Sequence, residues 1–191
     1  MPPEKQVFAA AVEALFVREL GARLSGPTRE RLKEAGLDLE QPLEVAYPLE
    51  SWKTFVRIAA EDLYPHLSRA EAHEWMGHHF MEGHLQTFMG RVMAALAPAL
   101  GPRRMLERLV QDLRSTTNFS ELLWQEHGPR HAELWMNDVL DDDPSFAAGL
   151  ILRAHQLTGA RYVHVDAGSL EGTACTFLIC WRESVPRAVG S

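Results

Sequence analysis

The sequence predicts an α+β fold, in which a helical N-terminal half packs on a small antiparallel β-sheet formed mainly by the C-terminal half. In the first half, apolar residues recur at spacings of three and four, as they do along the buried face of an amphipathic helix. From Phe119 onward, aromatic and apolar runs alternate with turn residues, which is typical of strands. Helices that precede strands in the chain favour an antiparallel sheet with helices packed on it.

Length and composition indicate one folded domain. The chain has 191 residues, of which 46% are hydrophobic and 24% are charged, close to the average for globular proteins. We expect a single domain over residues 1–191, with a helical part at about 4–114 and an α/β part at about 115–183.

Charge and hydropathy limit the partners and the location of the protein. The net charge of −7 disfavours nucleic acid, because that affinity depends on Lys and Arg side chains that neutralise phosphates. No apolar stretch approaches the roughly 20 residues that span a bilayer, and the Pro-Pro-Glu-Lys start lacks a signal peptide's hydrophobic segment. These features predict a cytoplasmic protein without membrane insertion. Cys175 and Cys180 fall on opposite faces of one expected strand, so free thiols are predicted.

Several amphipathic helices are predicted in the first part of the chain. Their expected ranges are Val7 to Leu20, Thr28 to Ala35, Trp52 to Leu63, Ser68 to Ala97 with a bend at Gly83, and, after the turn from Pro98 to Pro102, Met105 to Leu113. Ser68 and Glu71 have the form of a capping box, in which each side chain satisfies a backbone amide at a helix start. The segment from Leu37 to Tyr47 is expected to run extended over the surface.

The second part is expected to contain two hairpins around one helix. The predicted strands are Phe119 to His127, Arg130 to Asp138, Tyr162 to Asp166 and Thr173 to Trp181. The helix between the hairpins is expected to begin with Asp143 as N-cap and Pro144 as its first residue, and to end at Gly159. In the last strand, Cys175, Phe177, Ile179 and Trp181 share one face.

The expected long helix contains His73, His78, His79 and His84. At 100° per residue, His78 lies near the centre of the stripe formed by Leu85, Met89, Met93 and Leu96, so we expect it to face the core. Glu82 lies one turn later on the same face. The pair is interpreted as a buried hydrogen bond, a half-site for a metal, or the polar contact at the floor of a ligand pocket.

Methionines on the same helix suit an adaptable apolar pocket, a dimer interface or ordinary core. We therefore predict His78, Glu82, Met89 and Met93 as ligand-binding residues. No metal site is predicted, because His73 and His78 are one residue too far apart for the metalloprotease helix motif and point about 140° apart. No catalytic residues are predicted either, since the sequence lacks a serine elbow and a glycine-rich phosphate loop.

Several short phrases, read in order, resemble an uncharacterised paralogous family expanded in myxobacteria, which has no assigned activity. The phrases are Ala14-Leu15-Phe16-Val17-Arg18, Ala35-Gly36-Leu37-Asp38-Leu39, Tyr47-Pro48-Leu49-Glu50, Leu100-Gly101-Pro102-Arg103-Arg104, Gly128-Pro129-Arg130 and Glu133-Leu134-Trp135. The likeness runs from Val7 to Trp181.

The segment from Asp143 to Arg182, which contains Gly149, Gly159 and the strand Cys175-Thr176-Phe177-Leu178-Ile179, resembles the ending of four-vinyl-reductase-type domains. Those domains are similar in fold to haem nitric-oxide sensors and to trafficking-particle subunits. The resemblance implies helices packed on an antiparallel sheet, often in a dimer, with an apolar pocket. In the haem sensors a Tyr, a Ser and an Arg at alternating positions hold the propionates, and this sequence has no such triplet.

The sequence as a whole favours a non-enzymatic ligand-binding or regulatory and signalling module that forms a homodimer. We expect it to hold a small apolar ligand or a protein partner in an apolar pocket between helices and sheet, with no cofactor identified. One alternative is a haem or metal sensor that uses His78. The other is an enzyme whose site is spread over loops.

Overall fold

The computed structural model describes residues 3–182 and confirms the predicted α+β class, with helices in the first half and a four-stranded antiparallel sheet from the C-terminal part. The helices are α1 (Ala9–Val12), the π-helical segment η1 (Glu13–Glu19), α2 (Gly26–Glu34), α3 (Leu49–Leu63), α4 (Arg69–Leu85), α5 (Phe88–Arg114), the short 3₁₀ turn η2 (Leu140–Asp142) and α6 (Ser145–Gln156). The strands are β1 (Gln6–Phe8), β2 (Ala46–Pro48), β3 (Leu122–Gly128), β4 (His131–Met136), β5 (Arg161–Ala167) and β6 (Cys175–Arg182).

Within the described range, no helix combines the length and the hydropathy that crossing a membrane requires. The predicted domain limits of 1–191 include residues 1–2 and 183–191, and the predicted α/β part ends at residue 183; these positions lie outside the described residues.

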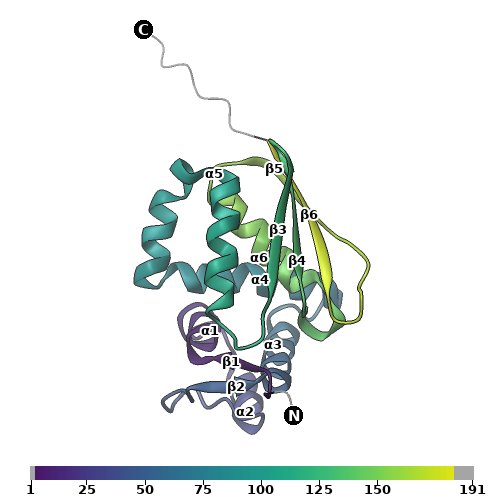
Figure 1. Ribbon diagram of the computed structural model, residues 1–191. Helices are drawn as coiled ribbons and strands as arrows, with labels where there is room; N and C mark the ends of the chain where they lie inside the picture. The colour runs from purple at the N-terminus through teal and green to yellow at the C-terminus, as the bar shows by residue number, and fades with distance from the viewer. Residues whose placement is uncertain (1–2, 183–191) are drawn as a thin grey trace.

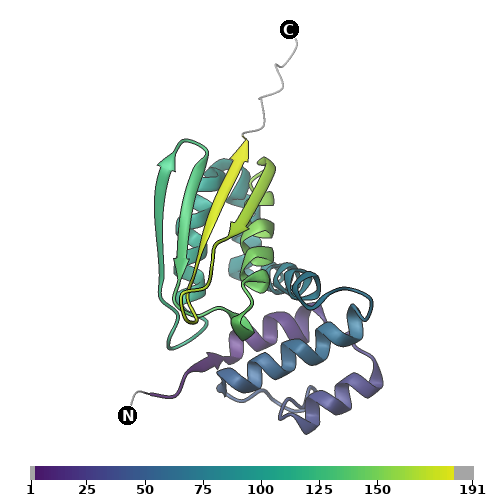
Figure 2. The ribbon, with the colours of Figure 1, turned by 90° about the vertical axis from the view of Figure 1, so that its right-hand side faces the viewer.

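The four-stranded sheet has the order β3-β4-β6-β5, and each neighbouring pair is antiparallel. Helices α5 and α6 lie along one face of this sheet, and α1, α2 and α3 form a separate helical layer below it (Figures 1 and 2). Both predicted hairpins are present, and Cys175, Phe177, Ile179 and Trp181 are buried as predicted. The alternation arises because one face of β6 meets the helices and the other meets solvent.

The predicted helix from Ser68 to Ala97 is wrong in its extent. The capping box at its start is present, with the Ser68 side chain and the Glu71 carboxylate each bonded to the other residue's backbone. However, α4 ends at Leu85, and Thr87 caps a new helix by accepting a hydrogen bond from the Gly90 amide at 3.0 Å. A threonine N-cap fixes a helix start, so the chain changes direction here and not at Gly83.

Helix α5 itself contains a sharp turn. Gly101 has φ +73° and ψ 172°, which lies outside the helical region and separates the helix into two halves, residues 88–100 and 102–114. The predicted turn from Pro98 to Pro102 is therefore confirmed, and Figure 1 shows the two halves side by side. Glycine tolerates this positive φ because it has no Cβ.

The N-terminal helix is also shorter than the predicted range from Val7 to Leu20. Residues Gln6 to Phe8 form strand β1, which pairs with β2 so that Val7 lies opposite Tyr47. The helix then widens into η1, where the Leu20 amide bonds to the Leu15 carbonyl, five residues back. The hydrophobic pattern does not reveal this strand, because three residues are too few to show an alternation of apolar and polar side chains.

Helix α4 packs against both groups of elements, with η1 and α3 on one side and α5 and α6 on the other. Its crossing with α6 is very close. A Cβ on Gly77 would lie 2.0 Å from the Phe146 carbonyl oxygen, and a Cβ on Gly149 would lie 2.0 Å from the Glu74 carbonyl oxygen. Gly83, the predicted bend, instead meets the backbone of Ala14 in η1. Only glycine permits these contacts, because the obstructing atoms are backbone.

The start of α6 differs by one residue from the prediction. Pro144, not Asp143, is the N-cap, and the Asp143 carboxylate accepts a hydrogen bond from the Ser145 amide at 2.9 Å. His73 of α4 also bonds to this carboxylate, with 3.1 Å between Nδ1 and Oδ2. Burial raises the pKa of Asp143, but the hydrogen bonds from His73 and Ser145 outweigh burial and lower this pKa to about 2. The pair therefore joins α4 to α6 at the crossing.

We expect Gly149→Ala to destabilise the protein by about 2 kcal/mol, because the new methyl group must push the α4 backbone away. This cost exceeds the gain of roughly 1 kcal/mol that alanine brings to a helix interior. Urea unfolding of the full chain measures the difference. Gly26→Ala is the control, since a Cβ there meets nothing within 4 Å. Equal stability of the two variants would contradict a close crossing.

Candidate functional site

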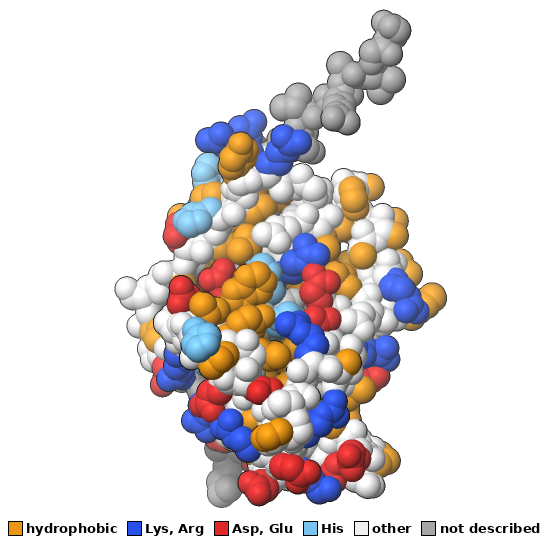
Figure 3. Space-filling view, turned by 180° about the vertical axis from the view of Figure 1, so that it is seen from behind, with side chains coloured by type: hydrophobic (Ala, Val, Ile, Leu, Met, Phe, Trp, Pro, Cys, Tyr) orange, Lys and Arg blue, Asp and Glu red, His pale blue; other side chains and the backbone are white. Residues whose placement is uncertain are grey.

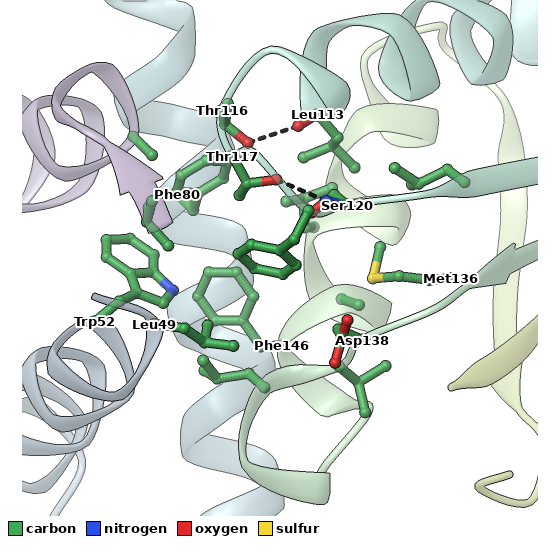
Figure 4. A pocket seen from close by; sticks show the side chains of 18 residues that line it. Leu49, Trp52, Phe80, Leu113, Thr116, Thr117, Ser120, Met136, Asp138 and Phe146 are labelled. Atoms are coloured by element: carbon green, nitrogen blue, oxygen red, sulfur yellow. Dashed lines mark hydrogen bonds between the residues drawn. The ribbon is translucent and has the colours of Figure 1, made fainter. Parts of the chain in front are cut away.

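An apolar cavity of about 100 Å³ lies between the N-terminal helices and the C-terminal α/β part. Its walls come from β1, α1, α3 and α4 on one side, and from the end of α5, the loop 116–120, the sheet and α6 on the other (Figure 4). It is lined by side chains that are distant in sequence, such as Val7, Leu49, Leu113 and Leu150. This position between helices and sheet agrees with the predicted apolar pocket.

Three aromatic rings form one wall of the cavity. Trp52 of α3 contacts Phe80 of α4 at 6.2 Å between ring centroids, and both contact Phe146 of α6, at 6.3 and 5.8 Å. Trp52 meets both phenylalanines edge to face, the two phenylalanine rings are tilted by 57°, and such contacts hold the rings in fixed orientations. The wall is therefore preformed, and it faces Met136 of β4 across the cavity (Figure 4).

Few polar groups reach the cavity, and most of them are already satisfied. The Thr116 hydroxyl donates to the Leu113 carbonyl at 2.7 Å, and the Thr117 hydroxyl accepts from the Ser120 amide at 3.0 Å. The Ser120 hydroxyl and the indole N–H of Trp52 form no hydrogen bond with any described residue. The indole can only donate. Figure 4 shows this nitrogen on the side of the ring that faces the cavity. A bound molecule that carries an acceptor would satisfy it.

The N-terminal segment closes one edge of the cavity. The Lys5 ammonium donates to the Asp138 carboxylate at 2.7 Å, and it lies 5.7 Å from the centre of the Phe119 ring. Asn118 accepts from the Gln6 amide at 2.8 Å and donates to the Glu4 carbonyl at 2.9 Å. The same segment thus borders the cavity and connects the first strand to the α/β part.

The structure places His78 away from this cavity. It is half-buried on the outer side of α4, in a hollow that Trp75 and Leu152 also line, with its ring centroid 5.3 Å from that of Trp75. The expectation that His78 faces the core is wrong. It assumed that the apolar stripe from Leu85 to Leu96 continues α4, whereas a new helix begins at Phe88. Burial and then the Arg153 charge lower the pKa of His78.

Of the other three predicted ligand-binding residues, Glu82 lies near His78, and its charge raises the pKa of that histidine, whereas the two methionines lie elsewhere. Glu82 forms an ion pair with Arg153 of α6. Met89 is 54% exposed and Met93 is buried, and both line a separate groove along α5. Figure 3 shows the face that carries α4, with histidine and hydrophobic side chains close together among charged ones. The role of His78, Glu82, Met89 and Met93 in ligand binding stays a prediction.

The histidine with the most developed set of partners is His79, which the sequence did not single out. Its Nδ1 lies 2.9 Å from the Glu19 carboxylate, and its Nε2 lies 2.6 Å from the Tyr64 hydroxyl. Burial lowers the pKa of His79, opposed by the hydrogen bond to Glu19, so the ring is neutral at pH 7 and accepts from Tyr64 at Nε2. Arg23 also reaches the ring, at 3.1 Å. These residues line neither the central cavity nor the hollow at His78.

The fold is that of the H-NOX proteins. One H-NOX protein from K. algicida, in the Fe(II) unliganded state, has a TM-score of 0.64 and 11% identity, covering 92% of this chain and 96% of its own. An H-NOX protein from S. oneidensis, in the Fe(II)NO ligation state, has a TM-score of 0.62 and 14% identity, covering 91% and 98%. Identities this low show a common fold alone.

By sequence, the chain belongs to the family described as protein of unknown function (DUF2378), whose model matches residues 5–182. No curated protein matches the sequence. Both resemblances inferred from the sequence, to a family without assigned activity and to the haem nitric-oxide sensor fold, are therefore confirmed.

The residues of the central cavity do not fit the haem that the fold implies. Among the described residues that line it there is no His, Cys or Tyr to ligate iron, and no Arg or Lys to hold a propionate. Its volume is also below the roughly 300–1,000 Å³ of typical cofactor pockets. For metals generally, the described residues contain no group of three or more His, Cys, Asp or Glu side chains placed to hold an ion.

His155 of α6, a fully buried histidine whose ring lies 5.9 Å from the Trp181 ring of β6, makes the stability depend on pH. Its Nδ1 donates to the Ile151 carbonyl, its Nε2 is buried without a partner among the described residues, and burial lowers its pKa to about 4. The folded protein therefore keeps this ring neutral, whereas the unfolded chain takes up a proton below about pH 6.5. The contribution of the neutral His155 ring to the free energy of unfolding is complete above pH 6.5 and is lost as the pH falls to about 4.

We expect this histidine to lower the free energy of unfolding by about 3 kcal/mol between pH 6.5 and pH 4. Urea unfolding at several pH values should show a shallower dependence in His155→Leu than in the wild type. Some dependence should remain, because burial also lowers the pKa of His78, His79 and His84. His164→Leu, at an exposed histidine, is the control and should keep the wild-type dependence. An unchanged profile in His155→Leu would refute this assignment.

Proposed function

We propose that the protein is a non-enzymatic ligand-binding and regulatory module that holds a small apolar molecule with one hydrogen-bond acceptor in the central cavity. The observation that carries the proposal is the unbonded indole N–H of Trp52, which faces a preformed apolar cavity. Apolar cavities of about 150 Å³ take up molecules such as benzene or xenon. The volume of about 100 Å³ therefore favours a compact ligand of a few heavy atoms.

The position of the cavity supports a regulatory role. A ligand in it would touch α3 and β1 on one side and α6 and the sheet on the other, so binding would change how firmly the two sides are held together. The Lys5–Asp138 ion pair and the Asn118 hydrogen bonds cross the same boundary. The predicted homodimer is part of the proposal, and sedimentation velocity of the full chain tests it.

Cyclobutanone is a suitable probe, because it has five heavy atoms, fewer than benzene, and is apolar apart from one acceptor. At ten times its Kd it should stabilise the protein by about 1.4 kcal/mol, or roughly 3–6 °C in Tm for a domain of this size. Trp52→Phe should lower the affinity for cyclobutanone about fivefold, which is the effect of one hydrogen bond. It should leave the affinity for methylenecyclobutane, an apolar molecule of the same shape, unchanged. Isothermal titration calorimetry measures both affinities.

Filling the cavity tests its location. Ala147 of α6 lines the cavity, so Ala147→Leu should abolish the effect of cyclobutanone on Tm. Ala148→Leu adds the same atoms at the next position, which does not line the cavity, and should respond like the wild type. If Ala147→Leu folds poorly, Ala11→Leu fills the cavity from α1. Binding that survives in both cavity variants would overturn the proposal.

The haem sensor is the second candidate, because solved H-NOX structures share the fold. The cavity lining speaks against it, and His78 lies in a different hollow. We therefore expect the purified protein, mixed with haemin, to show no Soret band of a ligated haem in absorption spectroscopy. A ligated spectrum that is lost in His78→Ala and kept in His66→Ala would favour the sensor over the apolar-ligand module.

A further inference from the structure

A second hollow, of about 370 Å³, runs between the two halves of α5 and is separate from the central cavity. Its apolar wall comes from the first half, where Met89, Val92, Met93, Leu96 and Leu100 follow one another at helical spacing. Met89, Val92 and Leu96 are 54%, 40% and 51% exposed. In Figure 3 this part of α5 lies at the right-hand edge, where hydrophobic side chains reach the surface.

The opposite wall is polar and positively charged. Arg104, Glu107, Arg108 and Gln111 follow at the same spacing on the second half of α5. Arg108 pairs with Asp112 at 3.2 Å, and Glu107 pairs with Arg103 at 3.8 Å, whereas Arg104 forms no ion pair within the described part of the chain. The groove therefore offers one available guanidinium opposite an apolar wall.

The charge of α5 contrasts with that of the whole chain. Five arginines against two carboxylates give this helix a net charge of +3, whereas the protein carries −7. An anion is thus attracted to α5 by a local positive field and repelled by most of the remaining surface. Electrostatics favours an anionic group at this end of the groove over a cationic one.

The dimensions of the groove decide what kind of molecule fits it. From Met89 to Leu100 the apolar row is about 16 Å long, so the volume of 370 Å³ gives a mean cross-section of about 22 Å². An α-helix is about 10–12 Å across, so its backbone would lie over the groove and only its side chains would enter. A single alkyl chain is the occupant of suitable width, and at about 30 Å³ per water-sized group the groove takes about a dozen such groups.

We propose that this groove binds a single-chain anionic amphiphile, with its alkyl chain along the Met89–Leu100 row and its carboxylate or phosphate at Arg104. The two methionines suit this role, because their unbranched side chains adapt to a flexible chain. Arg108 adds positive charge one turn further along.

Methionine-methyl NMR of the full chain, with dodecanoate below its micelle concentration as the probe, tests the proposal. The methyl signals of Met89 and Met93, assigned with Leu variants, should shift and saturate, while Met136 in the central cavity should not. Arg104→Gln should lower the affinity for dodecanoate about tenfold, which is the effect of losing a charged hydrogen bond. Arg91→Gln removes the same charge from α5 outside the groove lining and should change the affinity less than twofold.

Several outcomes would overturn the proposal. They are equal weakening by Arg104→Gln and Arg91→Gln, equal binding of dodecyltrimethylammonium, and the absence of shifts at Met89 and Met93. Shifts of these two signals that follow protein concentration and not dodecanoate would assign the face to a second copy of the chain. A shift of Met136 in place of Met89 and Met93 would locate dodecanoate in the central cavity and would also overturn the groove assignment.

Discussion

The close crossing of α4 with α6 is the contact on which the rest of the structure depends. The two backbones approach so closely at Gly77 and Gly149 that no side chain fits between them. On its other side, α4 meets η1 at Gly83 in the same way. One helix thereby ties the N-terminal helical layer to the α/β part through backbone contacts. Such contacts allow little adjustment, because backbone atoms cannot change rotamer as side chains do.

The central cavity is a consequence of this crossing. Phe80 follows Gly77 by one turn on α4, and Phe146 and Leu150 lie on either side of Gly149 on α6, so the crossing determines where these side chains meet Trp52. The cavity is what the aromatic rings leave unfilled. Closely packed interiors rarely leave such a space. The unbonded indole N–H of Trp52 places one hydrogen-bond donor on its otherwise apolar wall.

A common fold with the H-NOX proteins does not bring a common site. The backbone arrangement is shared over 92% of the chain, while the described residues of the cavity lining include no His, Cys or Tyr to ligate iron and no cation for a propionate. Function depends on particular side chains, and these differ here from what haem requires. The groove along α5 illustrates the same point, since its character comes from Arg104 and the exposed apolar row of one helix.

The sequence alone determined the α+β class, both C-terminal hairpins and the capping box at Ser68, because local periodicity and turn chemistry specify these features. The break at Thr87 was not predicted, since one cap residue inside a long apolar pattern is a weak signal. Because of that error, the sequence prediction placed His78 on the buried face of the helix. Only the tertiary structure decided which residues meet. Trp52 and Phe146 lie far apart in the chain, and no local pattern reports that they line one cavity. Periodicity shows which face of an element is buried, whereas the partner of that face is fixed by packing across the whole domain.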